Sequence, residues 1–376
     1  MNSPFAALLL CCCVACPGRL PVAVEVPVVT EPFPPLPTDA QVELVDVALV
    51  WPLPPATGAA AGWLGPILDC PTLQIFEPLT RADEPADLCA ALTVTAARLD
   101  PCFREGGPEA ECHPQLRLIL QPVFEGEARD ASLHVFYDVD KDVVLRAVAR
   151  LMLLRLQRDD DGRHALDVNP LLTDDEGRVA VAAVINDALA EATLVQFTQI
   201  TVHGGDAAWT FEFREFKDGA PTQGDAKQQH VLSTTPDVID ISVTPTSGSV
   251  DAFPLLLDDA AARLAPLAEQ QSAFDQAGRV ENPAFHDTGT LDCATCHLAA
   301  PARAAALQRE AFVDGPDTFT SPRHDRTPTA VYGNPQFIHA FAWRHRSLAI
   351  NQRVINESAL SADLVQEQLV ASGALP

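Results

Sequence analysis

The sequence predicts an α+β domain over residues 42–250 and a second, smaller domain over residues 272–376. In the first part, several runs alternate apolar and polar residues, which is typical of half-buried strands, and two longer runs have helical spacing. Residues 246–254 are rich in Thr, Ser, Gly and Pro and predict a linker. The following apolar run has helical spacing but contains Pro266, which predicts a kink or a stop, so residues 251–271 are assigned to a linker with a helix.

The first strands are expected at 42–49, 116–121 and 133–137. Pro122 ends the second of these runs, because proline has no backbone donor for a sheet. In the third run, three apolar residues alternate with two others in the strand period of two: Leu133, Val135 and Tyr137 alternate with His134 and Phe136. Between the first and second strands, residues 86–97 are predicted to form a short helix.

Two helices are predicted at 142–157 and 178–192, where apolar residues recur at helical spacing. In the first of them, three basic residues are expected to face away from the core: Arg146, Arg150 and Arg155. Burial of the apolar face against a sheet would give an α+β arrangement.

Further strands are expected after these helices. A strand ends at His203, a hairpin turn follows at 204–206, and the next strand carries aromatic residues on one face: Trp209, Phe211 and Phe213. One more strand is predicted at 238–243. An aromatic stripe of this kind is more typical of a core than of a ligand platform, and residues 42–250 show no active-site signature.

The charge of the chain is strongly negative. Its 51 acidic residues against 25 basic ones give a formal net charge of −26. Such a surface repels nucleic acid and anionic lipid head groups, so neither is expected as a partner. A protein partner is expected to be basic, at least locally.

The N-terminus has the pattern of an export signal. An eleven-residue apolar run from Phe5 to Ala15 is too short to span a bilayer and suits a secretory signal. Ala15 before Cys16 resembles the lipobox of bacterial lipoproteins, although Cys13 stands where Leu is usual and no basic residue precedes the run. Residues 1–16 therefore predict a signal with a lipid anchor on Cys16, and a cleaved signal without lipid is the alternative. The Pro-rich residues 17–41 predict an extended tether.

Four cysteines between the signal and the second domain predict two disulfides in an oxidising compartment: Cys70, Cys89, Cys102 and Cys112. Three pairings are open. Cys102–Cys112 is favoured because the residues between them contain a tight loop at 104–108, and Cys70–Cys89 would follow. A metal site that uses Cys112 and His113 is the alternative, but its spacing fits no common zinc pattern.

The clearest chemical signal is Cys293-Ala294-Thr295-Cys296-His297. Two thiols two residues apart, followed at once by an imidazole, form the c-type haem attachment pattern. Each Cys adds across one haem vinyl group, and His297 gives a ring nitrogen to the iron. At this motif the chain resembles the c-type cytochromes. The resemblance implies one covalently bound haem c, electron transfer, assembly on the outer side of the bacterial inner membrane, and a mainly α-helical cytochrome c-like haem domain over 272–376.

The resemblance also implies how this domain is organised. A helix leads into or follows the motif, a loop covers the haem and a terminal helix closes the fold; residues 321–335 and 358–370 are expected in the last two roles. Six aromatic residues are expected to form the apolar shell: Phe285, Phe312, Phe319, Phe337, Phe341 and Trp343.

The second iron ligand is expected to be a histidine. The chain has only two methionines, Met1 and Met152, and neither lies in the haem domain. His286 ranks first because a Gly-containing loop would fold it over the distal face, and His339 ranks second because of its apolar neighbours. His345 is expected to face solvent, and a five-coordinate iron is a further alternative.

These features predict an exported, membrane-anchored electron carrier that works with a redox partner protein on the periplasmic face of the cell envelope. One alternative is a haem enzyme, either a peroxidase or a subunit of a dehydrogenase. Another is a surface lipoprotein whose α+β domain binds a partner while the haem is accessory. The third alternative is a zinc site formed by Cys293, Cys296 and downstream histidines, although a second Cys pair is absent.

Overall fold

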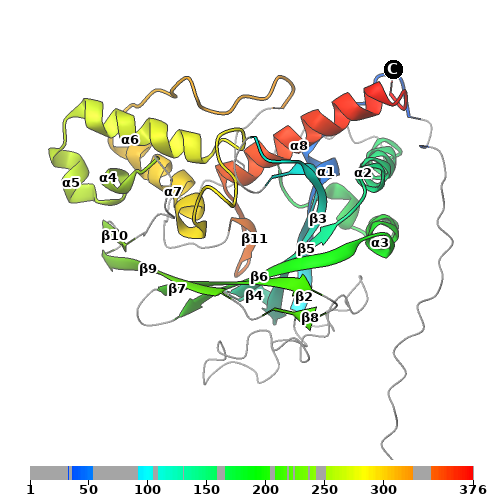
Figure 1. Cartoon of the computed structure of the whole chain (residues 1–376), viewed down its shortest axis with the longest axis horizontal. Helices are drawn as coiled ribbons and strands as arrows, with labels where there is room; N and C mark the ends of the chain where they lie inside the picture. The colour runs from blue at the N-terminus through cyan, green and yellow to red at the C-terminus, as the bar shows by residue number, and fades with distance from the viewer. Residues whose placement is uncertain are drawn as a thin grey trace, which may run out of the picture. The chain divides into compact units, whose positions relative to one another are not determined.

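An antiparallel β-sheet lies at the centre of the fold (Figure 1). The computed structural model describes residue 33 and residues 36–53, 92–104, 109–129, 131–158, 166–203, 208–217, 220–222, 225–235, 238–242, 251–324 and 340–375. Within these residues the strand order is β1-β2-β3-β5-β6-β7-β9-β10. The bounds are β1 Ala48–Val50, β2 Leu92–Phe103, β3 His113–Phe124, β5 Ala131–Asp138, β6 Thr193–His203, β7 Ala208–Lys217, β9 Asp225–Thr235 and β10 Val238–Ser242.

Four short strands extend this arrangement. β4 (Glu127–Ala128) pairs with β3 and β8 (Ala220–Pro221) pairs with β7, while β11 (Phe341–Arg344) and β12 (Ser347–Ile350) form a separate hairpin. The side-chain amide of Gln121 holds this hairpin to β3. Its Nε2 donates to the carbonyl oxygen of Trp343 at 2.7 Å, and its Oε1 accepts from the Trp343 N–H at 3.0 Å.

The helices fall into a group near the sheet's N-terminal strands and a group that carries the Cys-Ala-Thr-Cys-His motif of residues 293–297. The first group is α1 Leu44–Val47, α2 Lys141–Leu156, the 3-10 turn η3 Pro170–Leu172 and α3 Asp175–Ala190. The second is α4 Pro254–Leu257, α5 Asp259–Leu264, α6 Leu267–Val280 and α7 Cys293–Arg309, and α8 Gln352–Ala371 follows the hairpin. The helices predicted at 142–157, 178–192 and 358–370 are confirmed, and so is the break at Pro266, which precedes α6.

Alternation along the strands gives the sheet two different faces. On β5, Leu133 and Val135 are fully buried in the core that α2 and α3 cover. Successive side chains of a strand point to opposite faces, so His134 and Phe136 lie on the other face. Figure 1 shows α2 and α3 on one side of the sheet and α7 on the other. The motif helix therefore faces the side of the sheet that the first helices leave uncovered.

The core between the sheet, α2 and α3 includes an ion pair. Val144, Val148 and Leu151 of α2 are buried in this core as their spacing predicts. The prediction that Arg155 faces away is wrong, since the residue is only 2 % exposed. Its Nε and Nη2 donate to the two carboxylate oxygens of Asp46, each at 2.9 Å. The helical spacing of α2 could not predict this ion pair, because Asp46 lies on α1, near the beginning of the described residues.

Helix α8 belongs to the same core. It packs against α1, α2 and β2, and it contributes Val354, Ala359, Val365 and Leu369. Residues 33–376 form one compact unit. The terminal helix predicted to close a haem domain thus packs on the α+β part of the chain as well.

A second core lies between α4, α6, α7 and the far part of the sheet. Ala294 and Leu298 of α7 are fully buried there, together with Phe274 of α6 and with Ile200 and Phe211 of the sheet. The motif helix is therefore packed against the sheet through the residues next to its cysteines.

Three element predictions are wrong. Pro122 does not end its strand but lies within β3, which continues to Phe124, because its carbonyl oxygen still accepts from the Arg129 N–H at 2.9 Å. Residues 44–47 form α1 and only 48–50 form the strand β1, because Asp46 and Glu43 make a capping box that starts a helical turn. In the predicted helix 86–97, the described residues 92–97 belong to β2. The β-branched residues Thr93, Val94 and Thr95 favour the strand, and pairing with β3 decides in its favour.

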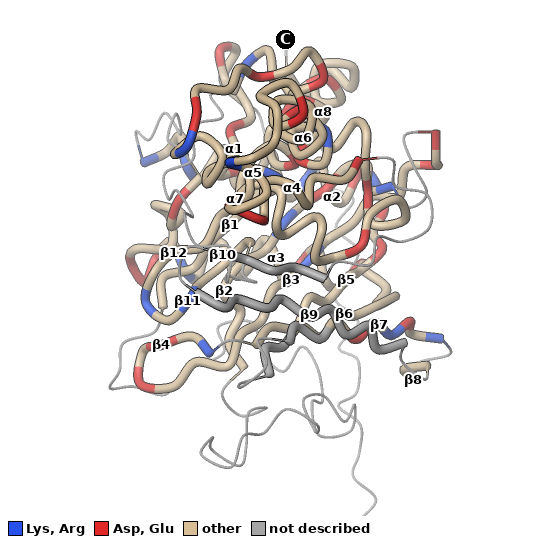
Figure 2. Tube along the Cα trace, turned by 90° about the vertical axis from the view of Figure 1, so that its left-hand side faces the viewer, with Lys and Arg blue, Asp and Glu red and all other residues tan. Residues whose placement is uncertain are grey.

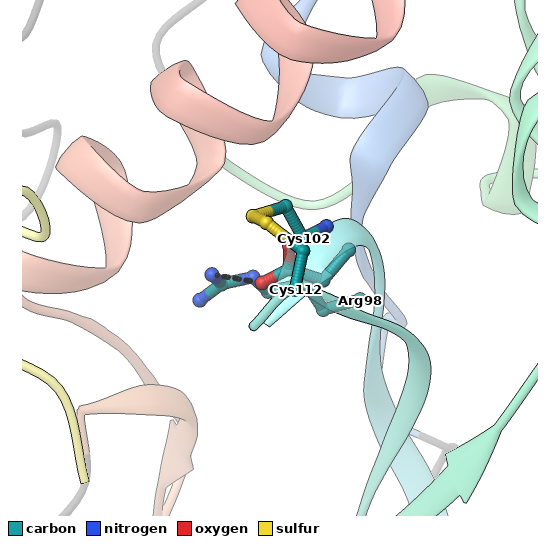
Figure 3. The surroundings of a disulfide bond; sticks show 4 residues. Arg98, Cys102 and Cys112 are labelled. Carbon is teal, nitrogen blue, oxygen red and sulfur yellow. Dashed lines mark hydrogen bonds and ion pairs between the residues drawn. A yellow bond between two sulfur atoms is a disulfide. The ribbon is translucent and has the colours of Figure 1, made fainter. Parts of the chain in front are cut away.

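One disulfide closes the end of β2 onto the start of β3. Cys102 and Cys112 are bonded, which confirms the favoured pairing (Figure 3). The Cys102 N–H donates to Asp100 Oδ1 at 3.0 Å, and Asp100 Oδ2 accepts from Arg98 Nη2 at 2.9 Å. Cys70, Cys89 and Cys16 lie outside the described residues, so the second disulfide and the lipid anchor stay predictions.

Replacing Cys102 and Cys112 together by Ser should lower the free energy of unfolding by about 2–3 kcal/mol. The sequence separation is 10 residues, and a loop near this length loses that much closure entropy on cross-linking. Urea unfolding measures the loss, and reductant should shift the wild-type midpoint toward that of the variant. Equal midpoints for the wild type and the variant under oxidising conditions would contradict the prediction.

Acidic residues are spread over helices and loops of the described chain, as Figure 2 shows. Several of them are paired with arginine on the surface, as in Arg146–Glu191 and Arg150–Asp187. Among the described residues, no helix has the length and apolar character needed to cross a membrane.

Candidate functional site

The Cys-Ala-Thr-Cys-His motif of residues 293–297 forms the beginning of α7. Asp292 is the N-cap, and its carboxylate accepts from the Thr295 N–H at 2.9 Å and from the Thr295 hydroxyl at 2.7 Å. An acidic N-cap satisfies free N–H groups and complements the helix dipole. The helix therefore starts exactly where the motif starts, because Asp292 immediately precedes Cys293.

Helical geometry brings the two thiols and the imidazole to one face. Residues three and four apart are neighbours on a helix surface, so Cys296 and His297 both lie beside Cys293. Ala294 and Leu298, on the other face, are fully buried in the second core. Cys293 is exposed and Cys296 partly buried, and neither forms a disulfide. The motif thus presents its three reactive side chains together.

This face of α7 borders a hollow between the helix and the sheet. Cys293, Cys296 and His297 all line it. The cavity itself holds about 150 Å³, and the hollow with its open mouth about 960 Å³. Small-molecule and cofactor sites commonly hold about 300–1,000 Å³. A ligand of that size would fill the mouth as well as the cavity, and so would remain partly open to solvent.

The opposite wall of the hollow is apolar and aromatic, and most of it comes from the sheet. Its apolar side chains are Ile119, Phe136, Ile200, Phe211 and Phe341, with Leu291 and Val354 at the sides. The ring of Phe211 meets that of His297 edge-on, with 5.8 Å between the ring centroids. Such a wall keeps water from the imidazole.

The aromatic shell predicted from the sequence is largely wrong. Of its described members, only Phe341 lines the hollow. Phe285 is 42 % exposed, Phe312 stacks on Phe274 in the second core, and Phe319 is buried in the first core. The prediction took neighbours in sequence, whereas the fold uses aromatic residues of β5 and β7. Phe337 lies outside the described residues.

Four charged side chains of the hollow, together with Asp100 as a partner of Arg98, form what we call the arginine cluster: Arg98, Arg117, Arg353, Asp100 and Glu357. Arg98 hydrogen-bonds to Glu357 and Asp100, and Arg353 Nε donates to Glu357 Oε1 at 2.6 Å. Burial opposes ionisation of Glu357, but the attraction of Arg98 and Arg353 outweighs it and holds the pKa of Glu357 well below its usual range. The cluster itself has three cations and two anions, whereas the lining of the hollow as a whole is balanced, because Asp287 and Asp292 also line it.

Arg117 is the third cation of the cluster. Burial, together with repulsion from Arg98, lowers the pKa of Arg117 to about 10. Its guanidinium lies 4.5 Å from the ring centroid of Phe136 and 5.2 Å from that of Phe103, and its buried Nε has no hydrogen-bond partner. Two further acidic residues of the hollow, Asp287 and Asp292, accept backbone N–H groups instead. The cluster therefore suits a carboxylate-bearing ligand.

The two thiols have different surroundings. Burial raises the pKa of the Cys296 thiol to about 11, so it is protonated at neutral pH. Reactive dithiols of redox enzymes have lowered pKa values instead. Cys296 therefore lacks the thiolate character of a cysteine that catalyses disulfide exchange.

The histidines predicted as second iron ligands have separate outcomes. His286 is buried, and its Nε2 lies 2.8 Å from Asp251 Oδ2 while its Nδ1 lies 3.3 Å from Thr290 Oγ1. It does not line the hollow that His297 lines, so its assignment stays a prediction that this structure does not favour. His339 lies outside the described residues. His345 is exposed, as expected.

Sequence reasoning missed His134 and Arg117 as members of the site. Both line the hollow from central strands of the sheet. A signal for both was present in the sequence, since each lies in an alternating strand at a position whose side chain points away from the core. His134 and Arg117 therefore share a face of the sheet with Phe136. Nothing in the local pattern shows what lies opposite that face.

No protein-family model matches the chain, and neither a curated protein nor a solved structure is significantly similar to it. In the part of the chain that the structure describes, no group of three or more His, Cys, Asp or Glu side chains is placed to hold a metal ion. Function must therefore be inferred from the residues around the motif.

Proposed function

We propose that the chain binds one haem c covalently through Cys293 and Cys296 and carries electrons in the bacterial cell envelope. The observation that carries this proposal is the common face of α7. Both thiols and His297 border one hollow whose opposite wall is apolar and aromatic. The residues present suit a haem, since they combine two thiols at vinyl spacing, an imidazole, an apolar wall and arginine donors for carboxylates.

Each group of residues then has a distinct role. Cys293 and Cys296 would hold the haem through two thioethers, since addition of each S–H bond across a vinyl double bond puts the sulfur on one carbon and the hydrogen on its neighbour and needs no oxidant. His297 donates a ring nitrogen to the iron. Arg117, with Arg98 and Arg353, pairs with the propionate carboxylates. Bound haem supplies a one-electron iron couple, whose potential depends on the ligands and on burial.

Electron transfer is the best-supported use of this site. Cys293 is exposed and the hollow is open at its mouth, so a partner can approach the attached edge. The acidic surface would favour a redox partner that is basic where it docks. Export and the lipid anchor on Cys16 are part of the same proposal, because haem attachment of this type takes place outside the bacterial inner membrane.

The test is expression of the full chain with a bacterial haem-attachment system, followed by intact mass and a pyridine haemochrome spectrum. We expect the mass of one haem and a spectrum typical of thioether-linked haem. Cys293→Ala with Cys296→Ala should remove both signals. The control variant Cys102→Ser with Cys112→Ser removes the same number of cysteines and should keep both the mass of the haem and the spectrum. A full-length chain that acquires no covalent haem would refute the proposal.

A further inference from the structure

We propose that His134 of β5 is the second axial ligand of the haem iron, opposite His297. This inference rests on the proposed function, because it requires a haem attached at Cys293 and Cys296. The second ligand would then come from the sheet rather than from residues close to the motif in the sequence.

The first argument is that His134 and His297 share their surroundings. Both line the hollow, and both also line a smaller cavity of about 10 Å³ beside it. No other histidine is among the described residues that line either space. An iron held by His297 would therefore have one further imidazole near it, on an element of the opposite wall.

The second argument is the register of the sheet. His134 pairs with Ile119 of β3 and with Thr198 of β6, and all three side chains line the hollow. Leu133 and Val135, the neighbours of His134, are buried in the core on the other face. Since β5 is hydrogen-bonded on both sides, its backbone holds the imidazole on a rigid element, as a ligand position requires.

The third argument concerns the competing histidine. His286 Nε2 is hydrogen-bonded to Asp251, which also accepts from Arg279. The carbonyl oxygen of His286 accepts from Arg353 Nη2 at 2.6 Å. To reach the iron, His286 would have to leave a buried carboxylate and move away from an anchored loop. His134, in contrast, already borders the hollow that His297 lines.

The chemical consequence is an iron with two imidazole ligands and no open position. Its potential should be lower than with one His and one Met ligand, since Met ligation raises it. Ile119, Phe211 and Phe341 line the hollow beside the two imidazoles, and an apolar surrounding limits access of water to the metal. Such a centre would favour electron transfer over catalysis on a bound small molecule.

The test uses the haem-loaded full chain and its His134→Ala variant. The wild type should show a low-spin spectrum in both oxidation states, and its reduced form should not bind carbon monoxide. In H134A we expect a high-spin spectrum, carbon monoxide binding, and return of the low-spin spectrum when imidazole is added. Rescue by imidazole would show a vacated ligand position rather than a general structural defect.

Three further variants separate the outcomes. His134→Met should keep the iron six-coordinate and raise its reduction potential above that of the wild type. This variant also tests the assignment if H134A does not fold. His286→Ala should leave the spin state unchanged, and the exposed His345→Ala is the surface control. An unchanged spectrum in H134A, a spin change in H286A instead, or carbon monoxide binding by the wild type would overturn the assignment while leaving covalent haem attachment intact. A wild type without covalent haem would overturn the proposed function itself.

Discussion

Replacing Asp46 by Asn should lower the free energy of unfolding by about 3–5 kcal/mol, because it leaves a buried cation without its partner. The Asp46 and Arg155 side chains are only 1 % and 2 % exposed. Asp46 receives two hydrogen bonds from Arg155 and one from the Glu43 N–H at 2.9 Å. Arg155 would lose both carboxylate bonds and keep its bond to the Gln41 carbonyl. Since single domains are stabilised by about 5–15 kcal/mol in total, the loss should be large, and urea or thermal unfolding measures it.

Two controls make this prediction specific to a buried pair. Asp187→Asn breaks the surface pair of Arg150 and Asp187, whose side chains are 41 % and 56 % exposed, respectively. It should cost less than about 0.5 kcal/mol. Replacing both buried partners, Asp46→Leu with Arg155→Met, should recover most of the loss, because no unpaired charge remains. Equal effects of D46N and D187N would show that the buried pair has no special role.

Replacing Glu357 by Gln should lower the free energy of unfolding by about 3 kcal/mol at pH 7. Glu357 lies between Arg98 of β2 and Arg353 of α8, and it is the anion that both arginines share. Without it, the arginine cluster holds three cations and only Asp100. The same change weakens the connection of α8 to the loop before the motif, since Arg353 also donates to the carbonyl oxygens of Val280 and His286.

The effect of Glu357→Gln should depend on pH in one direction. The pKa of Glu357 is lowered in the folded protein, whereas an unfolded chain has a Glu pKa near 4.3. Its stabilisation is therefore complete above about pH 5 and is lost as the pH falls through the folded pKa. The stability difference between wild type and E357Q should shrink below about pH 4. A difference that grows on acidification would contradict this view.

The control for this second prediction is Glu191→Gln, which removes the partner of Arg146 on the surface. That pair joins α2 to the end of α3 and is partly exposed to solvent. It should cost less than about 1 kcal/mol at pH 7 and should weaken further at high salt, because solvent and counterions screen it.

Local patterns in the sequence predicted several of the longer regular elements. The alternation in β3 and β5, the helical spacing in α2, α3 and α8, and the break at Pro266 all appear in the structure. These signals are local, since strand and helix periods depend on residues a few positions apart. The loop between Cys102 and Cys112 belongs to the same class, and their disulfide was predicted from it.

The predictions that failed depend on distant partners. Arg155 looked like a surface residue of α2 until Asp46 of α1 paired with it. Residues 92–97 looked helical, but pairing with β3 makes them a strand. The aromatic wall was sought near the motif, whereas Phe136 and Phe211 come from strands far earlier in the chain. In each case a contact made by the folded chain outweighs a local preference.

The sequence by itself determined the motif and its place on a helix. Cys293, Cys296 and His297 are close in the chain, and Asp292 caps them, so the relative positions of the three side chains follow from helix geometry. Only the tertiary structure decided what faces them. A strand's period of two shows that His134, Arg117 and Phe136 share one side of the sheet, but not which element covers that side. Packing of α7 against Ile200 and Phe211 determines it, because burial of apolar surface between distant segments selects the arrangement.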